Sequence, residues 1–200
     1  MTYSLVICSY KYGHLAAHAI ETALSQSKRF DKIYFVDDGV GDCEHLLKLY
    51  HEVSFTFRRH NLGIVANFQD MLNKVQTDYV MFLGADNWLR SDTLEKLSVF
   101  NTDIITYNII VTGQLKDEIC KLYPDTTHDY FGETRWIRKD QHHGSMMYKV
   151  SKAKEVGGYE KHKPDGERTD EDLALWDKMI KANATIEYIN QELLFYRRHK

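Results

Sequence analysis

The sequence predicts an α/β fold in which one largely parallel central sheet is flanked by helices. Short apolar runs alternate with segments whose apolar residues recur every three or four positions, and this order is typical of strands followed by helices in a parallel sheet. The chain has 200 residues, 43% of them hydrophobic, and no Pro/Ser-rich or low-complexity linker. Because that is enough for one well-packed core, we expect a single domain over residues 1–200.

The first strand and helix follow from an apolar run and the period behind it. Residues 5–8 read Leu-Val-Ile-Cys and predict a buried strand. A helix over about residues 14–26 places its apolar side chains on one face: Leu15, Ala19, Ile20, Ala23 and Leu24. Residues 33–36 predict the second strand.

The same order repeats through residue 83. A short helix at 44–50 precedes a third strand at 54–58. The next helix carries its apolar side chains on one side, namely Ile64, Val65, Phe68, Met71, Leu72 and Val75. The apolar run at 79–83 then predicts a fourth strand.

Beyond residue 83 the pattern continues and then loosens. Ser91 begins a predicted helix, and residues 104–111 predict a fifth strand. The inward side chains of that helix are Leu94, Leu97 and Phe100. Residues 112–141 have no sustained period, so we expect long loops over the sheet there.

Order resumes at residues 144–148, which predict a strand. A short helix follows and ends at Gly157 and Gly158. The last predicted helix has one apolar stripe: Leu173, Trp176, Met179 and Ile180. Residues 185–189 and 193–196 finish the chain as two short predicted strands.

Charge and cysteine content exclude several classes of protein. The net charge is −3, and the one dense basic cluster is at the end of the chain, Arg197, Arg198, His199 and Lys200, so we expect no nucleic-acid partner. The first residues lack the features of a signal peptide, and no apolar run approaches the roughly 18 residues of a membrane span. Cys8, Cys43 and Cys120 form no CxxC pair and are expected to be free thiols. These features predict a cytoplasmic protein.

Polar residues cluster where three of the predicted strands end. They are Ser9, Tyr10 and Lys11 after the first strand, Asp37, Asp38 and Gly39 after the second, and Asp86 and Asn87 after the fourth. Asp38 alone could belong to a turn, and Asp86 alone could cap a helix. Together, three such strand ends favour one ligand-binding cleft, because ligands of open α/β sheets bind beyond the carboxyl ends of the strands.

Six stretches, in this order, carry a resemblance to a known family. They are LVICSYKYGHLAAHAIETALSQS, IYFVDDGVGD, NLGIVANFQDMLNKVQTDYVMFLGADNWLRSDTLEKL, SKAKEVGGYE, EDLALWDKMIKA and LLFYRRH. With these motifs the chain resembles the family 2 glycosyltransferases of GT-A fold. The resemblance covers most of the chain and leaves out residues 112–141.

The resemblance implies a nucleoside-diphosphate sugar as the donor. It implies that Tyr10 stacks on the nucleobase and that Asp38 accepts a hydrogen bond from the base or the ribose. Ser9, Ala85 and Asp86 complete the expected donor-binding set. We expect a UDP-sugar by default, with GDP- and dTDP-sugars open.

The resemblance also implies a divalent cation, Mn²⁺ or Mg²⁺, that bridges the two phosphates. Asp86 is its expected ligand, and His199 stands where relatives carry a histidine near the metal or the diphosphate. The chain departs from the family pattern at Gly84, where relatives often have an acid. Gly84 is interpreted as giving the diphosphate close access to the backbone.

Asp172 matches the catalytic base of an inverting transfer, which removes the proton of the acceptor hydroxyl. Asp170 and Glu171 are the alternatives, and acids in the first turn of a helix are also explained by the helix dipole. Glu171 and His143 are placed on the acceptor side. The expected division is a nucleotide-sugar-binding half at 1–111 and an acceptor-binding and catalytic-base half at 112–200.

The implied acceptor is a glycan, a lipid-linked glycan or a surface polysaccharide, with peripheral association at the inner face of the membrane or with a partner protein. Two alternatives stay open: a catalytically silent nucleotide-sugar-binding module and a nucleotidyltransferase. A nicotinamide-dependent dehydrogenase is disfavoured, because the first strand is not followed by a glycine-rich phosphate turn.

Overall fold

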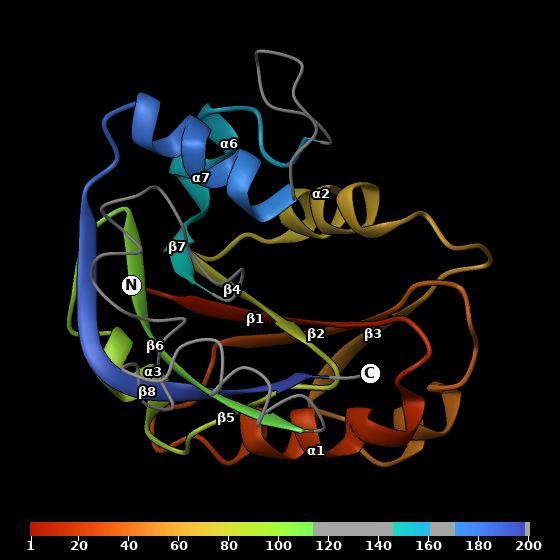
Figure 1. Ribbon diagram of the computed structural model, residues 1–200. Helices are drawn as coiled ribbons and strands as arrows, with labels where there is room; N and C mark the ends of the chain where they lie inside the picture. The colour runs from red at the N-terminus through yellow and green to blue at the C-terminus, as the bar shows by residue number, and fades with distance from the viewer. Residues whose placement is uncertain (114–145, 161–170, 199–200) are drawn as a thin grey trace.

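A computed structural model describes residues 1–113, 146–160 and 171–198, and all structural statements below concern these residues (Figure 1). Its strands are β1 (Tyr3–Ser9), β2 (Lys32–Asp37), β3 (Val53–Phe57), β4 (Tyr79–Gly84), β5 (Trp88–Leu89), β6 (Ile104–Gly113), β7 (Met147–Lys149) and β8 (Ile186–Arg198). Its helices are α1 (Gly13–Leu24), the 3₁₀ helix η1 (Glu44–Lys48), α2 (Ile64–Lys74), α3 (Thr93–Leu97), α6 (Val150–Glu155) and α7 (Glu171–Lys181).

The described strands form one eight-stranded mixed sheet in the order β3-β2-β1-β4-β7-β6-β8-β5. The first four in this order are parallel to one another. The strand β7 is antiparallel to both of its neighbours, β8 runs parallel to β6, and β5 pairs antiparallel with β8. The predicted α/β class is therefore confirmed, with the parallel part confined chiefly to the first half of the chain.

Helices cover both faces of this sheet, which makes a three-layer molecule (Figure 1). Alternate residues of β1 show why: Leu5 and Ile7 pack in a core with α1, η1 and α3, whereas Val6 packs in a second core with α2, α6 and α7. All three side chains are fully buried. A strand buried on both faces reads as a continuous apolar run, as residues 5–8 do.

The final strand differs from the prediction of two short strands. The strand β8 is continuous through Asn190 and Gln191, and its pairing with β6 shifts register around Asn108. Such irregularities admit extra residues without ending a strand. Strand β5 was not predicted, and the helix predicted from Ser91 begins instead at Thr93.

Two predicted details are borne out. Gly157 and Gly158 close α6 with φ angles of +90° and +73°, and their N–H groups donate to the carbonyls of Lys154 and Ala153. Cys8 and Cys43 are free thiols, while Cys120 lies outside the described residues. In the part of the chain that the structure describes, no helix has the length and hydropathy needed to cross a membrane.

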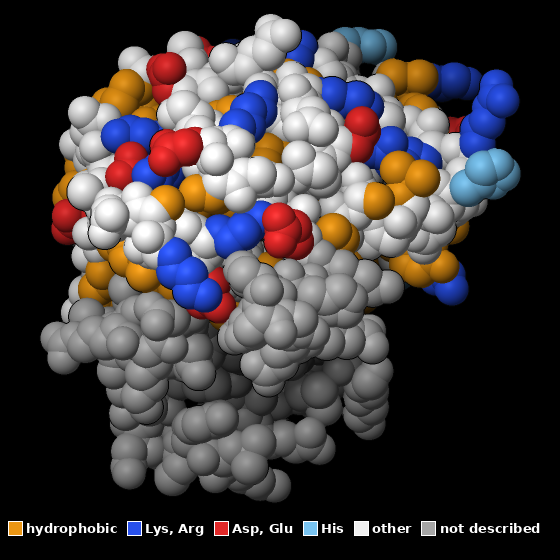
Figure 2. All heavy atoms as spheres, turned by 90° about the horizontal axis from the view of Figure 1, so that it is seen from above, with side chains coloured by type: hydrophobic (Ala, Val, Ile, Leu, Met, Phe, Trp, Pro, Cys, Tyr) orange, Lys and Arg blue, Asp and Glu red, His pale blue; other side chains and the backbone are white. Residues whose placement is uncertain are grey.

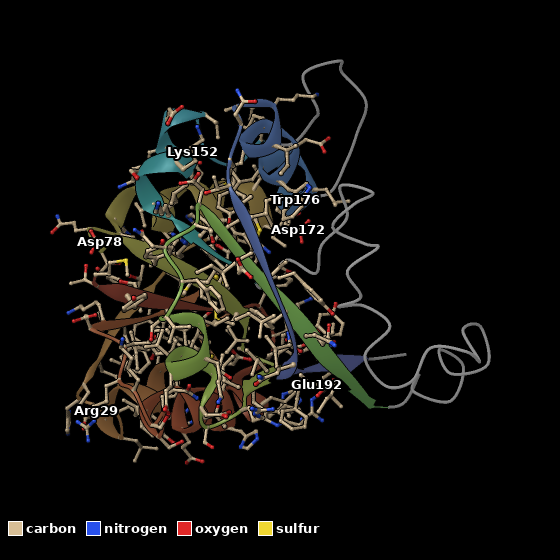
Figure 3. The ribbon with its side chains drawn as sticks, turned by 90° about the vertical axis from the view of Figure 1, so that its left-hand side faces the viewer. Arg29, Asp78, Lys152, Asp172, Trp176 and Glu192 are labelled. Atoms are coloured by element: carbon tan, nitrogen blue, oxygen red, sulfur yellow. The ribbon has the colours of Figure 1, made fainter. Side chains whose placement is uncertain are left out.

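The face that carries α2, α6 and α7 is polar on its surface. Lysine, arginine and acidic side chains are interspersed over it (Figure 2). Beneath this surface Trp176, on α7, is fully buried, as its place in the apolar stripe predicts (Figure 3). Trp88 is half-buried and stacks on Phe195 of β8 with ring centroids 5.1 Å apart.

Candidate functional site

A cavity of about 290 Å³ lies at the carboxyl ends of β1, β2 and β4, beside the start of α2. Its lining is formed by Cys8, Ser9, Tyr10, Tyr12, Asp38, Asn61, Gly63, Ile64, Asn67, Phe68, Gly84 and Asp86. Four of the five residues expected to bind the donor, Ser9, Tyr10, Asp38 and Asp86, are therefore brought together. This is the convergence of strand ends that the sequence predicts.

The adjacent acids Asp37 and Asp38 have different surroundings. Both carboxylate oxygens of Asp37 accept backbone hydrogen bonds, from Val40 and Gly41, each at 2.9 Å, so Asp37 builds the turn after β2. Asp38 is 4% exposed and lines the cavity. Its Oδ1 accepts a hydrogen bond of 3.0 Å from the N–H of Leu62.

Tyr10 lines the cavity and is 43% exposed as a residue. The next residue, Lys11, has a φ of +68°, and its Nζ lies 5.0 Å from the centroid of the Tyr10 ring. This left-handed backbone is uncommon for a residue other than glycine. An exposed aromatic ring next to a buried acid is suited to a flat, hydrogen-bonding ligand such as a nucleobase.

The turn that carries Asp86 is held by the last strand. The side-chain oxygen of Asn87 accepts a hydrogen bond of 2.8 Å from the N–H of Arg197, and the Nε of Arg197 donates to the carbonyl of Asp86 at 3.1 Å. The guanidinium of Arg197 also lies 4.9 Å from the centroid of the Trp88 ring. Asn87 therefore binds β8 rather than capping α3, whose N-cap residue is Asp92.

Gly84 leaves room for the Asp86 carboxylate. A Cβ at this position would lie 2.6 Å from Asp86 Oδ1 and 2.9 Å from Asn87 Nδ2.

Ala85, the fifth predicted donor residue, differs from the other four. Its side chain is fully buried in the core with α1 and does not line the cavity.

Two groups in the cavity wall are held in their neutral forms. Burial raises the pKa of the Cys8 thiol, the charge of Asp38 raises it further, and Arg58 opposes the shift. Burial also raises the pKa of Tyr12, and the charge of Asp86 adds to it. Because a thiol with a raised pKa is a poor nucleophile, Cys8 acts in this wall as a packed side chain.

Sequence reasoning missed the side of the cavity formed after β3. Asn61 and Gly63 come from the loop before α2, and Asn67 and Phe68 come from its first two turns. The same strand-end rule, applied to the third predicted strand, would have pointed to Asn61. The contribution of Asn67 depends on how α2 packs, which a strand-end rule does not specify.

Asp172 lies in the first turn of α7 (Figure 3), and its Oδ1 accepts a hydrogen bond of 2.7 Å from the N–H of Leu173. It is not among the residues that line the cavity. Its charge is one of the causes, after burial and Tyr148, that raise the pKa of Tyr159. Tyr159 packs edge-on against Phe68 at 5.3 Å between ring centroids, so two aromatic rings connect the surroundings of Asp172 to the cavity wall.

The remaining predicted site residues fall into two groups. Glu171 begins α7 beside Asp172 and is partly exposed. His143, His199 and Asp170 lie outside the described residues. The roles of Asp172 and Glu171 stay predictions.

A second group of potential metal ligands is explained by the local fold. Asp37, Asp42 and Cys43 have ligand atoms within 4.8 Å of one another. The Oδ2 of Asp42 accepts a hydrogen bond of 2.9 Å from the N–H of Gly13, at the start of α1. Burial raises the pKa of the Cys43 thiol to about 12, and its sulfur donates hydrogen bonds to Ser9 Oγ at 3.4 Å and to Asp42 Oδ1 at 3.2 Å. The hydrogen bond from Gly13 to Asp42 holds the loop after β2 against the start of α1.

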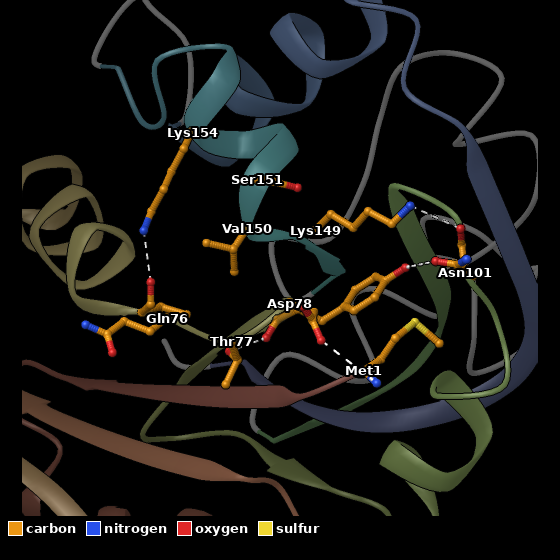
Figure 4. A pocket seen from close by; sticks show the side chains of 11 residues that line it. Met1, Gln76, Thr77, Asp78, Asn101, Lys149, Val150, Ser151 and Lys154 are labelled. Atoms are coloured by element: carbon orange, nitrogen blue, oxygen red, sulfur yellow. Dashed lines mark hydrogen bonds and ion pairs between the residues drawn. The ribbon is translucent and has the colours of Figure 1, made fainter.

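A larger cavity, of about 520 Å³, lies at the opposite end of the strands (Figure 4). Its two lysines are already engaged. Lys154 donates to the carbonyl of Val75 at 2.9 Å, and Lys149 forms an ion pair of 3.2 Å with Asp103. This cavity opens at the amino ends of β1 and β4, and Asp78 in its lining accepts hydrogen bonds from the N–H and the hydroxyl of Thr2 at 2.6 and 3.1 Å.

The chain matches a known protein family over most of its length. The sequence model of glycosyl transferase family 2 matches residues 4–157. The cholesterol galactosyltransferase of Borreliella burgdorferi (strain ATCC 35210 / DSM 4680 / CIP 102532 / B31) is 28% identical in an alignment of 110 residues that covers 51% of this chain and 31% of that protein.

Solved structures share the fold at lower identity. S. aureus TarS 1–349 in complex with UDP-GlcNAc is 14% identical with a TM-score of 0.78, over 100% of this chain and 59% of that chain. Its complex with UDP is 14% identical with a TM-score of 0.76, over 99% and 61%. This chain thus spans less than two thirds of either relative. The fold is the predicted GT-A fold, and the chain belongs to glycosyltransferase family 2.

Proposed function

We propose that this chain is an inverting glycosyltransferase that moves a sugar from a nucleoside diphosphate, UDP by default, to a hydroxyl group of a glycan acceptor. The observation that carries the proposal is the cavity in which Ser9, Tyr10, Asp38 and Asp86 converge from three strand ends. Family membership and the UDP and UDP-GlcNAc complexes of TarS support it.

The cavity is proposed to hold the nucleoside part of the donor. A volume of about 290 Å³ is at the low end of the roughly 300–1,000 Å³ usual for ligand pockets, which suits a nucleoside better than a whole sugar nucleotide. The base stacks on Tyr10, and the buried carboxylate of Asp38 accepts a hydrogen bond from the base or the ribose. Ser9 lies beside Asp38, whose N–H donates to the Ser9 carbonyl at 2.9 Å.

Asp86 is proposed to bind Mn²⁺ or Mg²⁺ together with the donor diphosphate. Both ions favour oxygen ligands, and a strand-end carboxylate with phosphate oxygens and water supplies them. The bound cation would neutralise the charge that develops on the departing diphosphate. His199 is proposed as a further ligand.

Asp172 is proposed as the catalytic base. The acceptor oxygen attacks the anomeric carbon while the bond from that carbon to the diphosphate oxygen breaks, and the acceptor proton passes to the Asp172 carboxylate. Glu171 and His143 are placed beside the acceptor. We assign residues 1–111 to the donor-binding half and 112–200 to the acceptor half.

The acceptor class is proposed from the family and from the galactosyltransferase relative, which is named for a lipid acceptor. A glycan, a lipid-linked glycan or a surface polysaccharide would fit. We place the reaction in the cytoplasm or at the inner face of the membrane, where the chain would associate with the surface or with a partner protein.

The proposal is tested by measuring UDP release from UDP-sugars with Mn²⁺, together with UDP affinity by calorimetry. Asp172→Asn is expected to lower turnover by about 10²- to 10⁴-fold while UDP affinity stays the same, because only the base is lost. Asp86→Asn is expected to lower both turnover and Mn²⁺-dependent UDP affinity.

Three results would contradict the proposal. Full turnover in Asp172→Asn removes that residue as the base. UDP binding without turnover, with every sugar donor offered, identifies a silent binding module. Release of pyrophosphate from a nucleoside triphosphate and a sugar phosphate identifies a nucleotidyltransferase.

A further inference from the structure

Arg58 connects three elements beside the cavity: it follows β3 and contacts both the end of β2 and the helix α2. It follows β3 directly, and its N–H donates to the carbonyl of Asp37 at 3.0 Å, at the end of β2. Its side chain is only 11% exposed. A long charged side chain that is this deeply enclosed needs partners for its guanidinium group.

The guanidinium group has three partners among the described residues. Its Nε donates to Asn67 Oδ1 at 2.9 Å and lies 3.6 Å from Asp38 Oδ1. Its Nη2 donates to Asp70 Oδ2 at 2.6 Å. Asp38 and Asn67 line the cavity, whereas Asp70 is on the outer side of α2 with 39% of its side chain exposed.

The contact with Asp38 has a clear electrostatic consequence. The Asp38 side chain is 6% exposed, and removing the Arg58 guanidinium would leave its carboxylate buried with the Leu62 N–H as its one hydrogen-bond donor among the described residues. A buried charge without its counter-charge is strongly destabilised. Arginine suits this task because its planar fork is rigid and always charged.

We propose that Arg58 is a positioning residue that sets the nucleobase preference of the cavity by fixing the orientation of the Asp38 carboxylate as a hydrogen-bond acceptor. This inference rests on the proposed function, and of the two partners given there for Asp38, the base and the ribose, it takes the base. An acceptor at this place favours a base with a ring N–H, such as uracil at N3, over cytosine, whose N3 is itself an acceptor. A site built to pair with an N–H group rejects the analogue that lacks it, because the carboxylate is then left unpaired.

The test compares the affinities of UDP and CDP, measured by calorimetry on the whole chain. The wild type is expected to bind UDP about 10- to 100-fold more tightly than CDP. Arg58→Met keeps the length of the side chain and removes its charge, and the preference is expected to fall to about threefold or less. Arg58→Lys restores the charge without the fork, so an intermediate preference is expected.

Asp70→Ala is the matched control. It removes another partner of the Arg58 guanidinium and loosens α2, but it leaves the contact between Arg58 and Asp38 in place. If Arg58 had a purely structural role, Arg58→Met and Asp70→Ala would change the ratio of UDP affinity to CDP affinity equally. The inference predicts a lower melting temperature in both variants and a changed ratio in Arg58→Met alone.

An unchanged ratio in Arg58→Met overturns the inference, and if that variant does not fold, an unchanged ratio in Arg58→Lys does so. A wild type that binds UDP and CDP equally well also overturns it, while leaving the donor-binding proposal standing. A wild type that binds neither nucleotide overturns the proposed function, and the inference with it.

Discussion

At the scale of single residues, the adjacent aspartates Asp37 and Asp38 have different roles. Both carboxylate oxygens of Asp37 accept hydrogen bonds from the backbone of the turn after β2, while Asp38 lines the cavity. The sequence predicts Asp38 through family register and strand position. It does not distinguish the two by residue type, because the difference arises only when β2 ends and the turn forms.

Gly84 gives a prediction at the same scale. In Gly84→Ala the new methyl group would lie 2.6 Å from Asp86 Oδ1, so the carboxylate has to turn away from its present position. If Asp86 holds the cation, Mn²⁺-dependent UDP affinity is expected to fall about tenfold, which is a typical loss when the orientation of a metal ligand is disturbed. Titration of UDP by calorimetry with and without Mn²⁺ measures it.

The control for Gly84→Ala is UDP affinity in the absence of metal, which is expected to stay within about twofold of the wild type. If Mn²⁺ raises the UDP affinity of Gly84→Ala as much as that of the wild type, the cation is not bound by Asp86 in its position beside Gly84. The substitution tests sterics alone, since Gly84 is not among the glycines with a positive φ.

At the scale of elements, β8 is the least expected part of the fold. The polar residues Asn190 and Gln191 predict a break between two strands, but the strand continues because register shifts in its pairing with β6 take up the extra residues. Its far end reaches the Asp86 turn through Arg197. A contact between residues more than 100 positions apart has no local sequence signal.

This contact predicts a role for Asn87. Asn87→Ala removes the acceptor for the Arg197 N–H and is expected to lower the free energy of unfolding by about 1 kcal/mol, since a partly buried N–H is left without this acceptor. It is also expected to weaken Mn²⁺-dependent UDP binding several-fold, because the turn that presents Asp86 loses its support. Urea denaturation and calorimetry measure the two effects.

Asn87→Asp is the matched control, because a carboxylate oxygen can accept the same hydrogen bond. It is expected to retain most of the stability that Asn87→Ala loses. Equal losses in the two variants would show that the hydrogen bond to Arg197 does not support the turn.

At the scale of the whole molecule, the sheet sorts the two cavities by chemistry. The cavity at the carboxyl ends of β1 and β4 is lined by Asp38 and Asp86, whereas the charged groups of the cavity at their amino ends, Asp78, Lys149 and Lys154, are engaged by neighbouring protein groups. Parallel strands thus place their polar strand ends together on one side, which is why four site residues could be predicted without coordinates.

Other parts of the site could not be predicted in this way. Arg58 and Asn67 contribute through packing of β3 and α2 rather than through the ends of the first, second and fourth strands. Ala85 was expected in the donor site from the family resemblance; its side chain packs in the core, so its predicted role is not supported by the lining of the cavity and stays a prediction. The periodicity of apolar residues predicts helices and strands, but it does not specify which side chains of different elements contact one another.

The most direct test of the central claim is a crystal structure of the chain grown with UDP and Mn²⁺. We expect the uracil ring against Tyr10 and within hydrogen-bond distance of Asp38, with the cation bound by an oxygen of Asp86 and by the diphosphate. A nucleotide bound instead in the cavity at the amino ends of the strands, or a cation held without Asp86, would contradict the account.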